Sequence, residues 1–114
     1  MLTQNQVQEF QQFRTSIEAL YPILNSASLD RQEWTKKMRS LQTVFQTEIQ
    51  PIRSDDYQTH SVLVEINKQM QLLKMDGLFL QTARQSETIQ SRVEQIRDRL
   101  KLLTNYCRMI LESD

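Results

Sequence analysis

The scarcity of residues that end helices and form turns most restricts how this chain can fold. Its 114 residues include one glycine and two prolines, well below the usual ~7% and ~5%. Apolar residues recur every three or four positions along four stretches of the chain, a spacing that places them on one face of an α-helix. Few turns and four amphipathic stretches together predict an all-α protein built from long helices.

Two of these stretches lie in the first half of the chain. The first runs from Val7 to Leu24 and contains Pro22, so a helix should end or kink near Tyr21. The polar break "NSAS" follows, and Ser28 is a candidate N-cap for the next helix. That helix is expected to stop at Pro51, and its apolar stripe comprises Trp34, Met38, Leu41, Phe45, Ile49 and Ile52.

The second half of the chain predicts two longer helices. One should extend from about Asp55 to Arg84, with a core stripe of Val62, Ile66, Met70, Leu73, Gly77 and Leu80. The other should start at Ser86, with a stripe of Ile89, Val93, Ile96, Leu100, Leu103, Cys107 and Ile110. Short connections make successive helices antiparallel neighbours, so residues 1–114 are expected to form a single domain, an elongated antiparallel four-helix bundle with short connections.

Composition limits where the protein acts and what it binds. The 14 basic and 14 acidic residues balance, so there is no bulk attraction for nucleic acid or an anionic membrane. No run of 18 apolar residues is present that would predict a membrane span. The first ten residues, "MLTQNQVQEF", lack the basic start of a secretion signal. We therefore expect a cytoplasmic protein.

Residues with catalytic or ligand-binding chemistry are few. His60 is the only histidine and is expected at the surface, and Cys107, the only cysteine, falls on an apolar stripe. The chain has no Glu-x-x-His pair for a di-iron site and too few glycines for a phosphate loop. The sequence thus predicts no catalytic, metal-binding or cofactor-binding residues.

A line of polar residues runs through the apolar face of the third predicted helix. Glu65, Gln69 and Asp76 fall close together on a helical wheel. With a turn near residue 85, Asp76 should lie within about one helical turn of both Arg92 and Arg99. Two interpretations follow: a structural ion pair that fixes helix packing, or the border of a groove that binds a partner.

Gly77 follows Asp76 and costs the helix ~1 kcal/mol relative to alanine. A glycine inside a helix indicates close approach by a large side chain of another helix. Trp34 and Tyr21 are both candidates for that side chain.

The segment "VEINKQMQLLKMDGLFLQTARQSETIQSRVEQIRDRLKLLTNYC" resembles the heterocyst frequency control protein PatD family of cyanobacteria. The similarity comprises Glu65, Lys68, "LLKMD", "FLQTARQ", Arg92, Arg99 and Tyr106-Cys107, with an earlier "LQTVFQTEI" from Leu41 to Ile49. Ser86 departs from the proline common there in the family. The resemblance implies a non-enzymatic regulator that binds the division protein FtsZ, alters its polymerisation, and tunes cell division and heterocyst differentiation.

The residues we expect at the partner-binding site are Asp76, Arg84, Arg92 and Arg99, and the three arginines are expected to contact an acidic partner surface. A homodimer formed through the long helices is also considered. Two other functions stay open. A chorismate mutase would need several cations around a dicarboxylate pocket, and the sequence does not place Arg14, Lys37 and Arg39 in that arrangement. A nucleic-acid-associated module would use the basic flank of Arg97, Lys101 and Arg108, although acids interrupt it.

Overall fold

The computed structural model describes residues 2–112, and within that range the chain is helical with no β-strand. The first half of the chain forms two helices, a one-turn helix between them and a short π-helical turn after the second. The second half forms two long helices. The elements are α1 (Gln4–Glu18), α2 (Tyr21–Leu24), α3 (Arg31–Val44), η1 (Phe45–Ile49), α4 (Tyr57–Thr82) and α5 (Ser86–Glu112). The predicted all-α class is confirmed.

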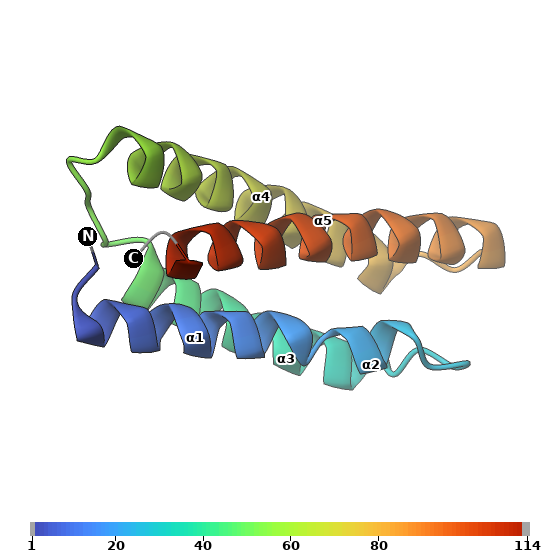
Figure 1. Cartoon of the computed structure of the whole chain (residues 1–114). Helices are drawn as coiled ribbons and strands as arrows, with labels where there is room; N and C mark the ends of the chain where they lie inside the picture. The colour runs from blue at the N-terminus through green and yellow to red at the C-terminus, as the bar shows by residue number, and fades with distance from the viewer. Residues whose placement is uncertain (1, 113–114) are drawn as a thin grey trace.

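The long helices lie along one axis and alternate in direction (Figure 1). The molecule is elongated, measuring 46 × 20 × 20 Å. α5 packs against both α4 and α1, and α3 packs against α1 and α4. α4 is tilted, so that its N-terminal end lies farther from α1 and α3 than its C-terminal end does (Figure 1).

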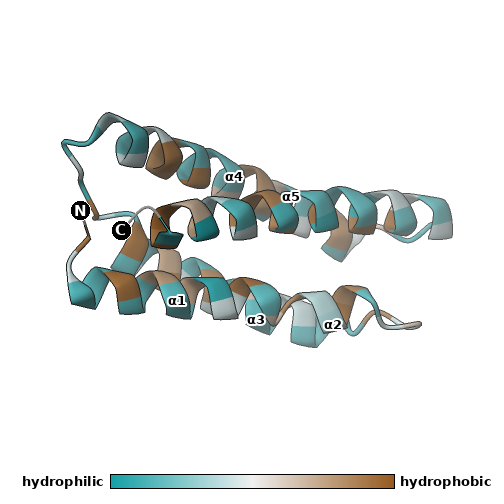
Figure 2. Cartoon of the chain, viewed as in Figure 1, coloured by the Kyte–Doolittle hydropathy of each residue, from teal (hydrophilic) through white to brown (hydrophobic). Residues whose placement is uncertain are grey.

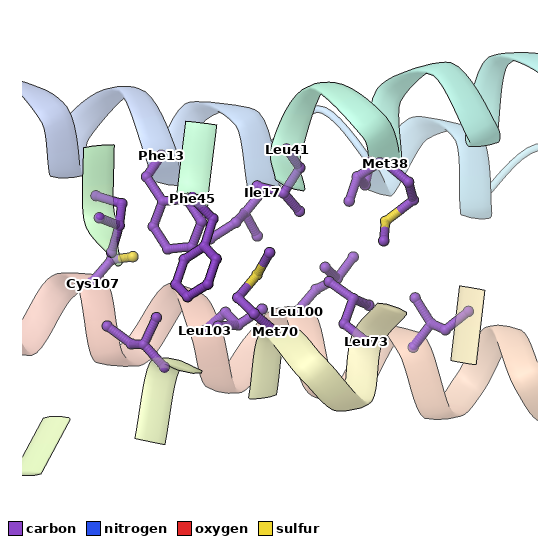
Figure 3. Packing of buried hydrophobic residues seen from close by; sticks show 14 of the residues in the cluster. Phe13, Ile17, Met38, Leu41, Phe45, Met70, Leu73, Leu100, Leu103 and Cys107 are labelled. Atoms are coloured by element: carbon purple, nitrogen blue, oxygen red, sulfur yellow. The ribbon is translucent and has the colours of Figure 1, made fainter. Parts of the chain in front are cut away.

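The core lies between two layers, with α1 and α3 on one side and α4 and α5 on the other (Figure 3). Side chains from both layers interdigitate, and the rings of Phe13 and Phe45 pack 5.9 Å apart. The stripe predicted for Trp34 to Ile52 is buried throughout, whereas Val62, Ile89 and Val93 are only partly buried. Full burial of one Leu, Ile, Phe or Met side chain stabilises the fold by about 1.5–3 kcal/mol relative to its exposure to water.

Local hydrogen bonds explain where the helices begin. Thr3 caps α1 in a reciprocal capping box with Gln6. Asp56 caps α4, and the hydrogen bonds that it accepts from Thr59 lower the pKa of its carboxyl. The expectation of Ser28 as a cap is wrong: Asp30 accepts from the Glu33 backbone N–H, and α3 begins one residue later. The negative charge of Asp30 at the start of α3 interacts favourably with the helix dipole, whereas Ser28, two residues earlier, carries no charge.

The helix that Pro51 was expected to end does stop there, but its last turn is a π-helix rather than an α-helix. The Gln50 N–H donates to the Phe45 carbonyl, five residues back, at 2.7 Å. The Thr47 and Thr43 hydroxyls donate to the carbonyls four residues before them, which loosens helices locally. Phe45 and Ile49, the first and last residues of this turn, are both buried in the core.

An arginine from α3 closes the end of α4, which stops at Thr82 rather than at Arg84. The Arg31 guanidinium donates to the carbonyls of Leu80, Gln81 and Ala83 at 3.3, 2.6 and 2.5 Å. The chain turns away at Ala83, so these carbonyls lack the i+4 amide donors of a continuing helix. The Leu80 carbonyl also accepts a bond from the Ala83 N–H at 3.3 Å. Gln81 adds a bond to the Thr35 hydroxyl at 2.9 Å. We call these bonds of Arg31 and Thr35 to the end of α4 the Arg31 clasp. They join residues about fifty positions apart in the sequence.

None of the helices within residues 2–112 combines the length and apolar character that a bilayer span requires.

We predict that Arg31→Ala lowers the free energy of unfolding by about 1–3 kcal/mol, because three carbonyls lose a charged donor. Urea denaturation followed by circular dichroism measures this. Lys37→Ala, at an exposed position on the same helix, is the matched control and should change stability by less than about 0.5 kcal/mol. Equal midpoints for the two variants would show that the clasp contributes nothing.

Candidate protein-interaction site

The polar line predicted on α4 faces α5, and its central residue is a buried carboxylate. The Asp76 side chain is only 6% exposed. It accepts a hydrogen bond from Arg99 Nε, and Arg92 Nη1 lies 3.9 Å from its other oxygen. The ion pair that helical register predicted is therefore present, with both arginines on one carboxylate.

Gln69 extends this cluster towards the N-terminal half of α4. It is buried, and Arg99 Nη1 donates to its side-chain oxygen at 3.4 Å. Glu65, one turn earlier, is partly buried and takes no part in these bonds. Because two guanidinium charges face one carboxylate, the cluster of Gln69, Asp76, Arg92 and Arg99 has a net positive charge.

Gly77 faces the opposite way, towards α3. A Cβ at this position would meet Met38 Cε and Trp34 Nε1 at 3.6 Å. Of the two side chains that the sequence offered for this contact, Trp34 is the one that lies at Gly77, together with Met38. At 3.6 Å these are ordinary van der Waals contacts, so an alanine Cβ would also fit. Asp76 and Gly77 thus serve two interfaces from adjacent positions.

Phe79 makes this cluster part of an exposed surface, which the sequence analysis did not anticipate. The Arg92 guanidinium lies over its ring, 4.6 Å from the centroid, and also donates to Gln95 at 3.3 Å. The Phe79 side chain remains 46% exposed, beside Met75 at 53%. We call Met75, Phe79 and Arg92 the Phe79 patch. Figure 2 shows hydrophobic residues recurring along α4, and Val64, Met75, Leu78 and Phe79 among them are exposed.

The geometry suits recognition of a carboxylate on a protein surface. Asp76 and the aromatic face hold the Arg92 guanidinium in place, so little side-chain entropy is lost when a partner binds it. A third of the Arg92 side chain stays open to solvent. Arg99 is more deeply buried, at 18%, and its guanidinium bonds to Asp76 and Gln69.

Arg84 is not part of this cluster. It lies in the connection between α4 and α5, is exposed, and lines a shallow hollow together with Arg31, Gln81 and Thr82. The sequence placed it at the end of a helix, whereas the chain leaves the helix at Ala83. Arg84 and Arg92 are therefore two separate cationic points near one end of the molecule.

The remaining candidate groups do not converge on a reaction site. His60 is exposed. Arg14 pairs with Glu18 on its own helix at 3.1 Å, and Lys37 and Arg39 are exposed on α3, so the cations considered for a mutase do not form a pocket together. Within residues 2–112 no group of three His, Cys, Asp or Glu side chains is placed to hold a metal ion.

One protein-family model matches most of the chain. The model of the CRR41 C-terminal domain family matches residues 10–105, which extend from the middle of α1 into the last turns of α5. No curated protein matches the chain, and no solved structure does.

We predict that Asp76→Ala lowers the free energy of unfolding by about 1–4 kcal/mol, because Arg99 is left partly buried without its partner. Asp98→Ala, which removes an exposed acid from α5, is the control, and urea denaturation measures both. The double variant Asp76→Leu/Arg99→Met should recover much of the loss, since no unpaired charge remains. An unchanged midpoint for Asp76→Ala would place this carboxylate effectively in solvent.

We also predict that Cys107 resists thiol reagents in the folded protein. Burial raises the pKa of this thiol to about 12 from a reference value of 9.0, so the reactive thiolate is roughly a thousandfold rarer at neutral pH. Labelling should be slow in buffer and complete within minutes in concentrated urea. Reaction in buffer at the rate of a free thiol would contradict the burial of Cys107.

Proposed function

The chain belongs to the CRR41 C-terminal domain family, and we propose that it is a non-enzymatic regulator that acts by binding a partner protein. The Phe79 patch is the observation on which this proposal rests. An aromatic side chain exposed by nearly half, beside an ordered guanidinium, has the composition of the residues that dominate protein interfaces. The molecule that presents it is, in this proposal, a single cytoplasmic domain with the form of an antiparallel four-helix bundle.

FtsZ is the partner to test first, because the α4–α5 segment resembles PatD proteins. In this proposal the chain tunes cell division, and heterocyst frequency where heterocysts form, by biasing FtsZ assembly. A rigid helical protein shifts polymerisation only by binding one state of the subunit or filament more tightly than the other. A homodimer would present two binding faces and could crosslink filaments.

The proposed contact residues are Arg84, Arg92 and Phe79, with Asp76 holding Arg92 in position. Arg84 in the α4–α5 connection and Arg92 on α5 are separate cationic points, and both are accessible. A partner surface with acidic residues around an apolar contact would match this arrangement.

We predict that the wild-type protein changes the light-scattering trace of FtsZ polymerising with GTP, and that Arg84→Glu/Arg92→Glu reduces the change at least tenfold. The control is Lys101→Glu/Arg108→Glu, which reverses two exposed charges elsewhere on α5 and should retain the effect. Circular dichroism checks that each variant is folded. Identical traces with and without excess wild-type protein would reject FtsZ as the partner.

A further inference from the structure

A groove follows the junction of α3 and η1 with α4, on the other side of α4 from α5. Three hollows of about 250, 170 and 270 Å³ succeed one another along it. The first and second share Gln42 and Lys74, and the second and third share Phe45, Gln50 and Asn67. We call this continuous depression the α3–α4 groove.

The groove is long, with apolar side chains at its base, and its middle hollow is also lined by Gln42, Gln46, Gln50 and Gln71. Trp34, Met38 and Met70 contribute to its floor, and the exposed side chains of Val64 and Leu78 flank it on α4. Its α4 side extends from His60 to Gln81, roughly 30 Å at the rise of an α-helix. A groove between two helices accepts the side-chain ridge of a third, and about 20 residues of helix would cover its length.

The charges along the groove have one sign. Arg39, Lys74 and Arg53 line it, and no Asp or Glu is among the residues of its three hollows. The chain as a whole is neutral, so this is a local separation of charge. The hollow between the start of α4 and the end of α5, by contrast, includes Asp56 and Glu112.

A buried acceptor adds to the case for an occupant. Asn67 Oδ1 is buried without a hydrogen-bond partner, and Asn67 lines both the second and third hollows. An acceptor in this position costs free energy until a donor reaches it.

We propose that the α3–α4 groove binds an amphipathic helix of a partner protein, with acidic residues flanking its apolar stripe. The apolar floor selects the stripe, and Arg39, Lys74 and Arg53 select the acids. This inference rests on the proposed function only in taking the partner to be a protein. It uses a different face of α4 from the Phe79 patch.

The test uses a display library of 21-residue helices with leucine fixed at every third or fourth position. Positions flanking the leucines are varied among Glu, Lys and Gln, and selection is carried out at physiological salt. We expect recovered helices to favour Glu over Lys. The strongest helix, synthesised, should bind at least tenfold more tightly than its Lys-for-Glu version. Binding should also change the emission of Trp34, which is the only tryptophan of the chain and lines the groove.

Two charge-reversal variants locate the binding. Arg39→Glu/Lys74→Glu, at exposed positions, should weaken binding of the acidic helix at least tenfold and reverse the preference towards the Lys version. Lys101→Glu/Arg108→Glu makes the same charge change on α5 and should stay within twofold of wild type, since screening limits charge effects to about 8 Å. Arg84→Glu/Arg92→Glu should also retain the peptide. A negative result in the FtsZ experiment is thereby distinguished from a negative result for helix binding in the α3–α4 groove.

Several results would overturn the proposal. One is recovery of helices without acidic bias, or of none above background; another is equal weakening in both charge-reversal variants. Displacement of the peptide by a short DNA duplex at equal concentration would assign the groove to nucleic acid instead. A wild-type dimer that Arg39→Glu/Lys74→Glu converts to a monomer, measured by sedimentation, would assign it to a second copy of the chain.

Discussion

The burial of the Asp76 carboxylate between α4 and α5 is the constraint on which the surrounding structure depends. A charge removed from water must be paired, and only one register of α4 against α5 brings both Arg92 and Arg99 to it. That register places the Arg92 guanidinium over Phe79. At the adjacent position of α4, Gly77 contacts Trp34 and Met38 of α3. One ion pair thereby fixes the α4–α5 register and orders a partly exposed arginine.

α4 is the helix that relates this packing to function. It is apolar on several sides, because its core stripe is accompanied by exposed Val64, Met75, Leu78 and Phe79. A helix that is apolar on several sides is usually covered by neighbouring elements. Phe79 is partly covered by Arg92 from α5, whereas Leu78 borders the open α3–α4 groove. The two proposed binding faces therefore lie on different sides of α4, and both include apolar side chains that the other helices of the protein leave exposed.

Several features of the fold and the candidate site could be predicted because they depend on local spacing. The apolar stripe from Trp34 to Ile52, the stop at Pro51 and the pairing of Asp76 all follow from helical periodicity and a short turn. The exposure of Phe79 could have been suspected, since Leu78 and Phe79 are neighbours in the apolar stretch and cannot share one face. The π-helical turn at Phe45–Ile49 could not, because the same apolar spacing also fits an α-helix.

The sequence by itself determined the helical class, the four amphipathic faces and the residues available for an ion pair, because each depends on contacts within one or two helical turns. The tertiary structure decided which side chains contact Gly77, how Arg31 ends α4 from about fifty residues away, and which cations line one groove. Those outcomes depend on the tilt of α4 against α3 (Figure 1). Tilt is set by the combined packing of all the helices, and no single stretch of sequence specifies it.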